Sequence, residues 1–272
     1  MKKTLFSLSA LFALSAGIVQ ADTSLRYHYD FEKISGTGSG TAAAINHNLS
    51  DAPGTGSWTK TDGWLGWTNY GALGSNWAYN HPSGGASINL TGQGPNNSLG
   101  VNTSTGFTFS FFIRDNGTPI YQQMFQINSS SGQNINAFKV TGDASNAGLW
   151  EFRSGTTNIG NWASTEIPTN TFANIVLTFQ NGTLAGYKNG TRFITATGVN
   201  LTGDITSITL GNPGSVAAYD EVALYSGVLN QEEITYLASH PAKDFTVPEP
   251  ATATLGLAGL ALLALRRRRR AA

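Results

Sequence analysis

The pattern of apolar and polar positions is clearest in residues 174–196, where two Asn-Gly pairs separate three alternating segments. Asn-Gly between such segments favours a type I′ hairpin turn, because both central residues of that turn need a positive φ. The two pairs are Asn181-Gly182 and Asn189-Gly190. They predict an antiparallel meander of three strands joined by two-residue turns.

Two-residue turns fix the register of this meander. Phe179 is expected to face Leu184, Leu177 to face Gly186, and Gly186 to face Phe193 across the second turn. One face then carries apolar side chains and the other polar ones: Ile175, Leu177, Phe179, Leu184 and Phe193 against Thr178, Gln180, Thr183, Tyr187 and Arg192. The polar face is expected to meet water. The apolar face needs a covering layer, and a second sheet is favoured because only one helix is predicted downstream.

Further strands are predicted on both sides of the meander. Residues 24–32 alternate, with one apolar and one polar face: Leu25, Tyr27, Tyr29 and Phe31 against Arg26, His28, Asp30 and Glu32. Other short strands are predicted at residues 86–90, 107–114, 120–128, 137–140, 149–153, 207–210 and 219–225. Short strands with turn signals between them are typical of an all-β sandwich of two antiparallel sheets.

One helix is predicted after the last strand. Asn230 is placed to cap it, Glu233 completes a capping box, and Leu229 can pack on Ile234 as a hydrophobic staple. The helix is expected to run to about Ser239, because Pro241 follows shortly after.

Composition narrows the function classes. The chain has 272 residues, of which 32 are glycine and 12% are charged, as expected for a turn-rich β protein. It has no cysteine, which excludes a disulfide framework and thiolate chemistry. Residues 22–245 carry nine Lys and Arg against fifteen Asp and Glu, a net charge of −6. A nucleic-acid partner is therefore disfavoured for this part of the chain.

Both ends of the chain have the pattern of targeting segments. Residues 1–21 have a basic start, an apolar run and small residues up to Ala21, which predicts a signal peptide that signal peptidase cleaves after Ala21. At the other end, the motif at residues 247–250 contains Pro248, Glu249 and Pro250. An apolar segment at 251–265, predicted to be a transmembrane helix, and five arginines at 266–270 follow it.

This tail, residues 246–272, resembles the PEP-CTERM sorting signal of Gram-negative bacteria in the order and position of its three parts. The resemblance implies export across the inner membrane, at least transient anchoring there by the C-terminal helix, and recognition by an exosortase-type enzyme. Delivery to the cell surface, the outer membrane or an extracellular matrix is then expected.

Candidate ligand-binding residues lie in an aromatic-rich stretch. Trp64, Trp67, Trp77 and Tyr79 are interleaved with glycines, and flat aromatic faces can stack on sugar rings. The alternative is that these side chains pack into the core.

The sequence contains no motif that indicates enzymatic catalysis. Glycoside hydrolysis needs a pair of carboxylates that flank the scissile bond, whereas Asp115, Asp143, Glu151 and Glu166 are widely spaced in the sequence and suggest no such pair. No zinc or serine-hydrolase motif is present. The protein is therefore not expected to be an enzyme.

Residues 25–237 resemble the laminin-G-like, concanavalin-A-like jelly-roll domains of bacterial surface proteins. The segments that carry the resemblance are residues 107–112, 174–190, 210–212 and 220–225 and the helix at 229–237. The resemblance implies a domain at residues 22–245 with two packed sheets of roughly six strands each. It also implies frequent roles in carbohydrate or protein binding.

Some members of this family bind a calcium ion that ties the first and last strands together. Asp30 and Asp220, with Glu32 or Glu221, would supply the oxygen ligands, so structural calcium is the one cofactor that the resemblance suggests.

The function predicted from the sequence is that of an exported surface or matrix protein that binds polysaccharide or glycoprotein without catalysis. The alternatives are a structural matrix component without its own ligand and, less favoured, a glycoside hydrolase.

Overall fold

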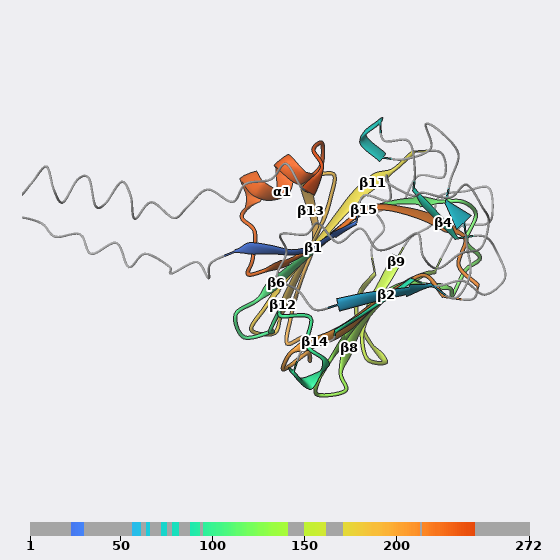
Figure 1. Cartoon of the computed structure of the whole chain (residues 1–272). Helices are drawn as coiled ribbons and strands as arrows, with labels where there is room; N and C mark the ends of the chain where they lie inside the picture. The colour runs from blue at the N-terminus through green and yellow to red at the C-terminus, as the bar shows by residue number, and fades with distance from the viewer. Residues whose placement is uncertain are drawn as a thin grey trace, which may run out of the picture.

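The computed structural model describes residues 23–29, 56–60, 64–65, 72–74, 78–81, 88–92, 95–140, 150–161, 171–212 and 214–242. These residues form fifteen strands, two 3-10 turns (η2, Ala72–Gly74; η3, Pro95–Asn97) and one α-helix. The strands build two antiparallel sheets, and the helix α1 lies on the side of one sheet that faces away from β2, β8 and β14 of the other (Figure 1). The predicted all-β sandwich is confirmed.

The first sheet has eight strands. Their order is β13 (Thr191–Thr197), β12 (Thr183–Lys188), β11 (Ala173–Gln180), β6 (Phe107–Asp115), β15 (Ala217–Ser226), β4 (Tyr79–His81) and β3 (Trp64–Leu65), and β1 (Ser24–Tyr29) also pairs with β15. The central strands β6, β11 and β15 are buried along nearly their whole length. Both faces of this sheet are therefore covered over its centre.

The second sheet has seven strands. Their order is β10 (Thr157–Asn161), β9 (Trp150–Ser154), β8 (Asn134–Lys139), β7 (Gln123–Ser129), β14 (Ile205–Leu210), β5 (Ile88–Gly92) and β2 (Gly56–Lys60). Eight and seven strands exceed the roughly six per sheet that the resemblance implied. Strand β10 was not predicted, because Ile159 is its only large apolar residue.

The meander of β11, β12 and β13 forms as predicted at its turns. Asn181 and Gly182 have φ of 48° and 75°, and Asn189 and Gly190 have φ of 49° and 78°. These values are those of type I′ turns. The predicted pairs Phe179–Leu184 and Leu177–Gly186 are also observed.

The predicted pairing of Gly186 with Phe193 is wrong. Gly186 faces Ile194, because a β-bulge makes Phe193 an extra residue in β13. A Cβ atom on Gly186 would lie 2.6 Å from Ile194 Cγ2 and 2.9 Å from Phe193 Cζ. The bulge brings both side chains over position 186, so a larger residue there would force Ile194 or Phe193 to move.

A second bulge changes the predicted faces of the first strand. Leu25 pairs with Tyr225 and Tyr27 with Leu224, which leaves Arg26 as an extra residue. Leu25 therefore packs on the outer side of the eight-stranded sheet, whereas Tyr27 and Tyr29 reach the core between the sheets. The prediction that Leu25, Tyr27 and Tyr29 share one face is wrong for Leu25.

The core between the sheets is aromatic at its centre. Phe109 and Phe111 of β6 contact Phe125 of β7, with ring centroids 6.3 and 5.7 Å apart. Phe125 in turn contacts Trp150 and Phe152 of β9 at 6.3 and 5.6 Å. Edge-on and tilted contacts of this kind stabilise a core beyond the burial of ring area.

The outer face of the eight-stranded sheet is solvated only in part: Gln180, Thr183 and Arg192 are exposed as predicted, but the centre of this face is covered. A second apolar cluster covers it, consisting of Val176, Ala223, Tyr225, Leu229, Ile234, Leu237 and Ala242, with Leu25 and Tyr187 packed against it. Thr178, predicted to meet water, is 5% exposed. The covering residues come from α1 (Gln231–Leu237) and from the chain on either side of it.

Helix α1 starts as predicted. The Asn230 side chain accepts hydrogen bonds from the N–H groups of Glu232 and Glu233, and the Glu233 carboxylate accepts the N–H of Asn230. This is a complete capping box. Leu229 and Ile234 belong to one apolar cluster, consistent with the predicted staple. The helix ends at Leu237, two residues before the expected Ser239.

Neither targeting segment can be compared with the structure. Residues 1–21 and 246–272, with the transmembrane helix expected at 251–265, lie outside the described residues. Within the described part of the chain, α1 is the only α-helix, and it is too short to cross a membrane.

Replacing Gly186 with valine is expected to destabilise the protein by about 2 kcal/mol, because the new side chain overpacks against Phe193 and Ile194. Chemical denaturation monitored by circular dichroism measures the change. Ala185→Val, at the neighbouring half-buried position of the same strand, is the control and is expected to change stability much less. Equal stability of Gly186→Val and the wild type would contradict this account of the bulge.

Candidate functional site

The aromatic residues predicted to contact sugar are placed only in part by the structure. Trp64 lies in β3 and Tyr79 in β4, and pairing of these strands sets Trp64 opposite Asn80 and Leu65 opposite Tyr79. Trp64 and Tyr79 thus lie on adjacent strands at one edge of the eight-stranded sheet. Trp67 and Trp77 lie outside the described residues. Sugar stacking by these residues stays a prediction.

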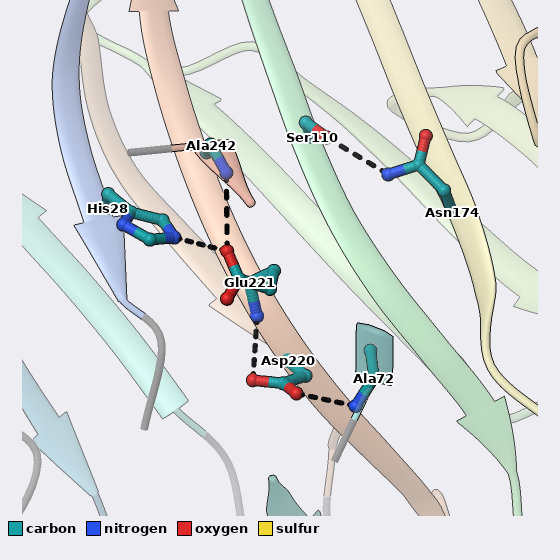
Figure 2. Close-up of polar contacts among 7 residues, drawn as sticks. All are labelled: His28, Ala72, Ser110, Asn174, Asp220, Glu221 and Ala242. Atoms are coloured by element: carbon teal, nitrogen blue, oxygen red, sulfur yellow. Dashed lines mark hydrogen bonds and ion pairs between the residues drawn. The ribbon is translucent and has the colours of Figure 1, made fainter. Parts of the chain in front are cut away.

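The acidic pair on β15 is buried and occupied by hydrogen bonds (Figure 2). Asp220 is fully buried, and its two carboxylate oxygens accept the N–H groups of Ala72 at 2.7 Å and of Glu221 at 2.9 Å. Glu221 has a φ of 47°, in the left-handed region, at a bulge where β15 pairs with β6. The extra residue of this bulge was not predicted, because a bulge depends on the pairing with the partner strand.

The Glu221 carboxylate joins three distant parts of the chain (Figure 2). His28 of β1 is fully buried, and its Nε2 lies 2.6 Å from Glu221 Oε2. The same oxygen accepts the N–H of Ala242, which follows α1, at 3.3 Å. Because it is buried and contacts Glu221, His28 is a structural residue rather than a surface one.

Burial raises the pKa of the nearby Tyr225 hydroxyl far above its usual value, and the charges of Glu221 and Glu233 raise it further.

The predicted calcium site rests on residues that are only partly described. Asp30 and Glu32 lie outside the described residues, so their distance from Asp220 is not defined. Among the described residues, no three His, Asp or Glu side chains gather as metal ligands. Asp220 and Glu221 offer the hard oxygen atoms that calcium prefers, and a cation would share them with the N–H donors described above. Calcium binding stays a prediction.

A buried ion pair links the two sheets. Lys139 Nζ of β8 lies 2.7 Å from Asp115 Oδ2 of β6, and both side chains are fully buried. The other Asp115 oxygen accepts the N–H groups of Gly117 and Thr118 at 3.0 and 2.7 Å. Asp115 was one of the acids considered for catalysis, and its oxygens are instead occupied by a structural network.

Other described carboxylates are engaged in the same way. Glu151 pairs with Arg153, which also lies over the Phe138 ring at 4.8 Å, and Asp204 accepts the Asn102 amide at 2.7 Å. Glu233 caps α1, and Glu232 lies exposed in the first turn of that helix. In the part of the chain that the structure describes, all the acids except Glu232 thus have a hydrogen-bonded partner.

A hollow of about 290 Å³ lies among the turns at one end of the seven-stranded sheet. We call it the rim hollow; its lining consists of Gly132, Gln133, Asn134, Ser154, Gly155, Thr157, Ile159, Gly198 and Asn200. Gln133 Nε2 donates to Asn200 Oδ1 at 2.7 Å, and Ser154 Oγ donates to the Asn200 carbonyl at 3.1 Å. Amides, hydroxyls and one apolar side chain thus line a hollow without a carboxylate.

Sequence reasoning missed both the rim hollow and an unusual tyrosine. The hollow is built from turns far apart in the sequence, so no local motif marks it. Tyr121 was assigned to a strand at 120–128, but β7 begins at Gln123. Tyr121 has a φ of 63° and is 67% exposed, whereas bulky residues rarely adopt a positive φ. The preceding Pro119 was the available signal for a turn there.

Comparison with family models gives two matches. The model described as the concanavalin A-like lectin/glucanases superfamily matches residues 82–235. The model of the PEP-CTERM protein-sorting motif matches residues 246–270. Both resemblances found in the sequence are confirmed. No relative was found among the curated proteins.

Solved structures share the fold at low sequence identity. Domain 4 of AbnA, a GH43 extracellular arabinanase from Geobacillus stearothermophilus in complex with arabinotriose, is 19% identical with a TM-score of 0.55, over 79% of this chain and 98% of that one. The binding domain of Botulinum neurotoxin serotype D is 12% identical with a TM-score of 0.51, over 79% of this chain and 50% of that one. These likenesses support the fold alone.

Asp220→Asn is expected to lower the free energy of unfolding by about 1–3 kcal/mol, because an amide offers one acceptor oxygen where the carboxylate offers two to the N–H groups of Ala72 and Glu221. Thermal unfolding measures the loss, with the exposed Glu232→Gln as control.

If calcium binds here, it raises the melting temperature of the wild type relative to EDTA and has a smaller effect on Asp220→Asn. Identical wild-type melting in calcium and EDTA would overturn the metal prediction without affecting the hydrogen-bond prediction.

Proposed function

The chain belongs to the concanavalin A-like lectin/glucanases superfamily and carries a PEP-CTERM sorting motif, and from this premise we propose that it is a non-catalytic carbohydrate-binding protein. The sorting motif implies exosortase processing, export, and a destination at the cell surface or in the extracellular space. The proposal adds that the folded domain binds polysaccharide or the glycan of a glycoprotein there.

The rim hollow is the observation that carries the proposal. Neutral sugars present hydroxyl groups that accept hydrogen bonds, and the amides of Gln133, Asn134 and Asn200 keep N–H groups to donate to them, because the contacts within the protein use their oxygens and only some of their N–H groups. Ile159 adds an apolar surface for the carbon face of a sugar ring. Ligand sites commonly combine apolar surface with a few placed polar groups in this manner.

The hydrogen bonds of the acidic side chains favour carbohydrate binding without hydrolysis. A glycosidase needs two carboxyl groups that flank the scissile bond at roughly 5–9.5 Å from each other. Asp115, Glu151, Asp204, Asp220 and Glu221 of the described residues are each hydrogen-bonded to a protein partner, and none of them lines the rim hollow. This arrangement favours a binding module over the alternative hydrolase.

A saccharide as ligand class also has support from the fold comparison. Domain 4 of AbnA, which shares the fold, was solved in complex with arabinotriose. The transfer of this ligand class rests on analogy of fold, since one fold hosts many functions. Weak binding at a single site would be strengthened by dense display of many copies on a surface.

Gln133→Ala and Asn200→Ala are each expected to weaken oligosaccharide binding about five- to tenfold, because each removes a hydrogen-bonding amide from the rim hollow. Isothermal titration against the best ligands from a glycan array measures this. Gln180→Ala, an exposed amide outside the hollow, is the matched control and is expected to bind normally. Absence of any binding by the wild type would favour the structural matrix component, and release of reducing ends from the glycan would favour the hydrolase.

We expect alanine at Trp64, Trp67 or Trp77 to reduce glycan binding several-fold if these rings stack on sugar, as the sequence predicts. Tyr79→Ala is the fourth variant of the series. The same array detects the change. Trp58→Ala, in β2 of the other sheet, is the control. Unchanged binding in all four variants would remove aromatic stacking from the proposal and leave the rim hollow as the site.

A further inference from the structure

We propose that a second hollow at the bulge of β1 binds an acidic sugar, a hexuronate residue whose carboxylate pairs with Arg26. This inference rests on the proposed function, because it names a class of carbohydrate ligand for the same domain. The hollow has a volume of about 420 Å³. It lies between Arg26, the chain that leads into β6, the residues before β14 and the end of β15.

Arg26 is the basis of the proposal. It is the extra residue of the β1 bulge, so it is left out of the regular ladder with β15. Its Nε is buried and has no hydrogen-bond partner, and none of the ion pairs among the described residues includes it. A partly desolvated guanidinium without an ion-pair partner is unfavourable, and a bound anion would relieve that cost.

The remaining lining suits a polyol better than a bare anion. Ser98, Thr105 and Ser226 contribute hydroxyls, and Asn102 contributes an amide. Asp204 lies in the same hollow, where its Oδ1 accepts the Asn102 amide at 2.7 Å. Asp204 adds an acceptor for ligand hydroxyl groups, and it forms no ion pair with Arg26.

The charges select a carboxylate over more highly charged groups. Asp204 lines the same hollow as Arg26, so a doubly charged phosphate group would meet more repulsion there than a singly charged carboxylate. A carboxylate carries one negative charge, and its planar geometry matches the two parallel N–H donors of arginine. A hexuronate combines that carboxylate with ring hydroxyls, which is the chemistry that the lining offers.

The second hollow is close in sequence to the rim hollow. Asn200 lines the rim hollow and Asp204 lines the second hollow, and residues 200–204 run between them. The Asp204 backbone is fixed in place, because its N–H donates to Ser130 Oγ and its carbonyl accepts the Ser130 N–H. Neutral and acidic sugars of a heteropolysaccharide would thus bind on the two sides of one short segment.

The test is isothermal titration of the purified full chain with tetramers of galacturonate, glucuronate and mannuronate, and with a neutral galactose tetramer. Arg26→Ala is expected to weaken binding of at least one uronate tetramer tenfold or more and to leave the neutral tetramer unaffected. Arg26→Lys keeps the charge but loses the planar fork, so a three- to tenfold loss is expected. Arg192→Ala, an exposed arginine in β13, is the matched control and is expected to bind like the wild type.

Raising sodium chloride from 50 to 500 mM is expected to weaken uronate binding by the wild type and to have little effect on Arg26→Ala. Folding of each variant is checked by circular dichroism, and Arg26→Lys replaces Arg26→Ala if the latter does not fold. Uronate binding that is insensitive to Arg26, or weakened equally by Arg192→Ala, would overturn the inference. Wild-type binding of the neutral tetramer alone would overturn this inference and leave the proposed function standing, whereas binding of neither class would remove both.

Discussion

Burial of both faces of the eight-stranded sheet is the constraint on which the rest of the structure depends. Its inner face joins the aromatic core, and its outer face is covered by α1 and the adjoining chain. Polar side chains under this cover are therefore kept from water and need hydrogen-bond partners within the protein. Thr108 accepts the N–H of Leu229. Asn174 donates to Ser110, and His28 contacts Glu221 (Figure 2). The contacts at Leu229 and at Ala242, whose N–H donates to Glu221, hold the chain on either side of α1 to the sheet, because an unpaired buried polar group would be costly.

Turns and caps could be predicted from the sequence, whereas bulges could not. The Asn-Gly pairs and the capping box of α1 depend on local backbone chemistry, so a few neighbouring residues determine them. A bulge depends on which residues the partner strand can accommodate, and alternation in one strand does not reveal it. The bulge at Arg26 accounts for the error in the faces of β1, and the bulge at Phe193 accounts for the error in the register of β13. The bulge at Glu221 in β15 was not predicted either.

The same distinction explains how little of the candidate site was visible in the sequence. The bulge at Arg26 places a guanidinium in a hollow, and the turns near Gln133, Ser154 and Asn200 form another. These groups meet only through the antiparallel topology, since their segments are separated in the chain. Because the centres of β6, β11 and β15 are buried, the ends of the sandwich are left as the places where polar groups can form hollows open to a ligand.

The shared contact at Glu221 brings the two ends of the domain close together. His28, near the start of the described domain, and Ala242, at its end, meet one and the same oxygen atom. The two extremities of the domain are thus neighbours on β15, and a short peptide would span the gap between them. The fold is therefore suited to circular permutation, with new termini opened at an exposed turn such as Asn181-Gly182, and to insertion as a cassette within a larger polypeptide.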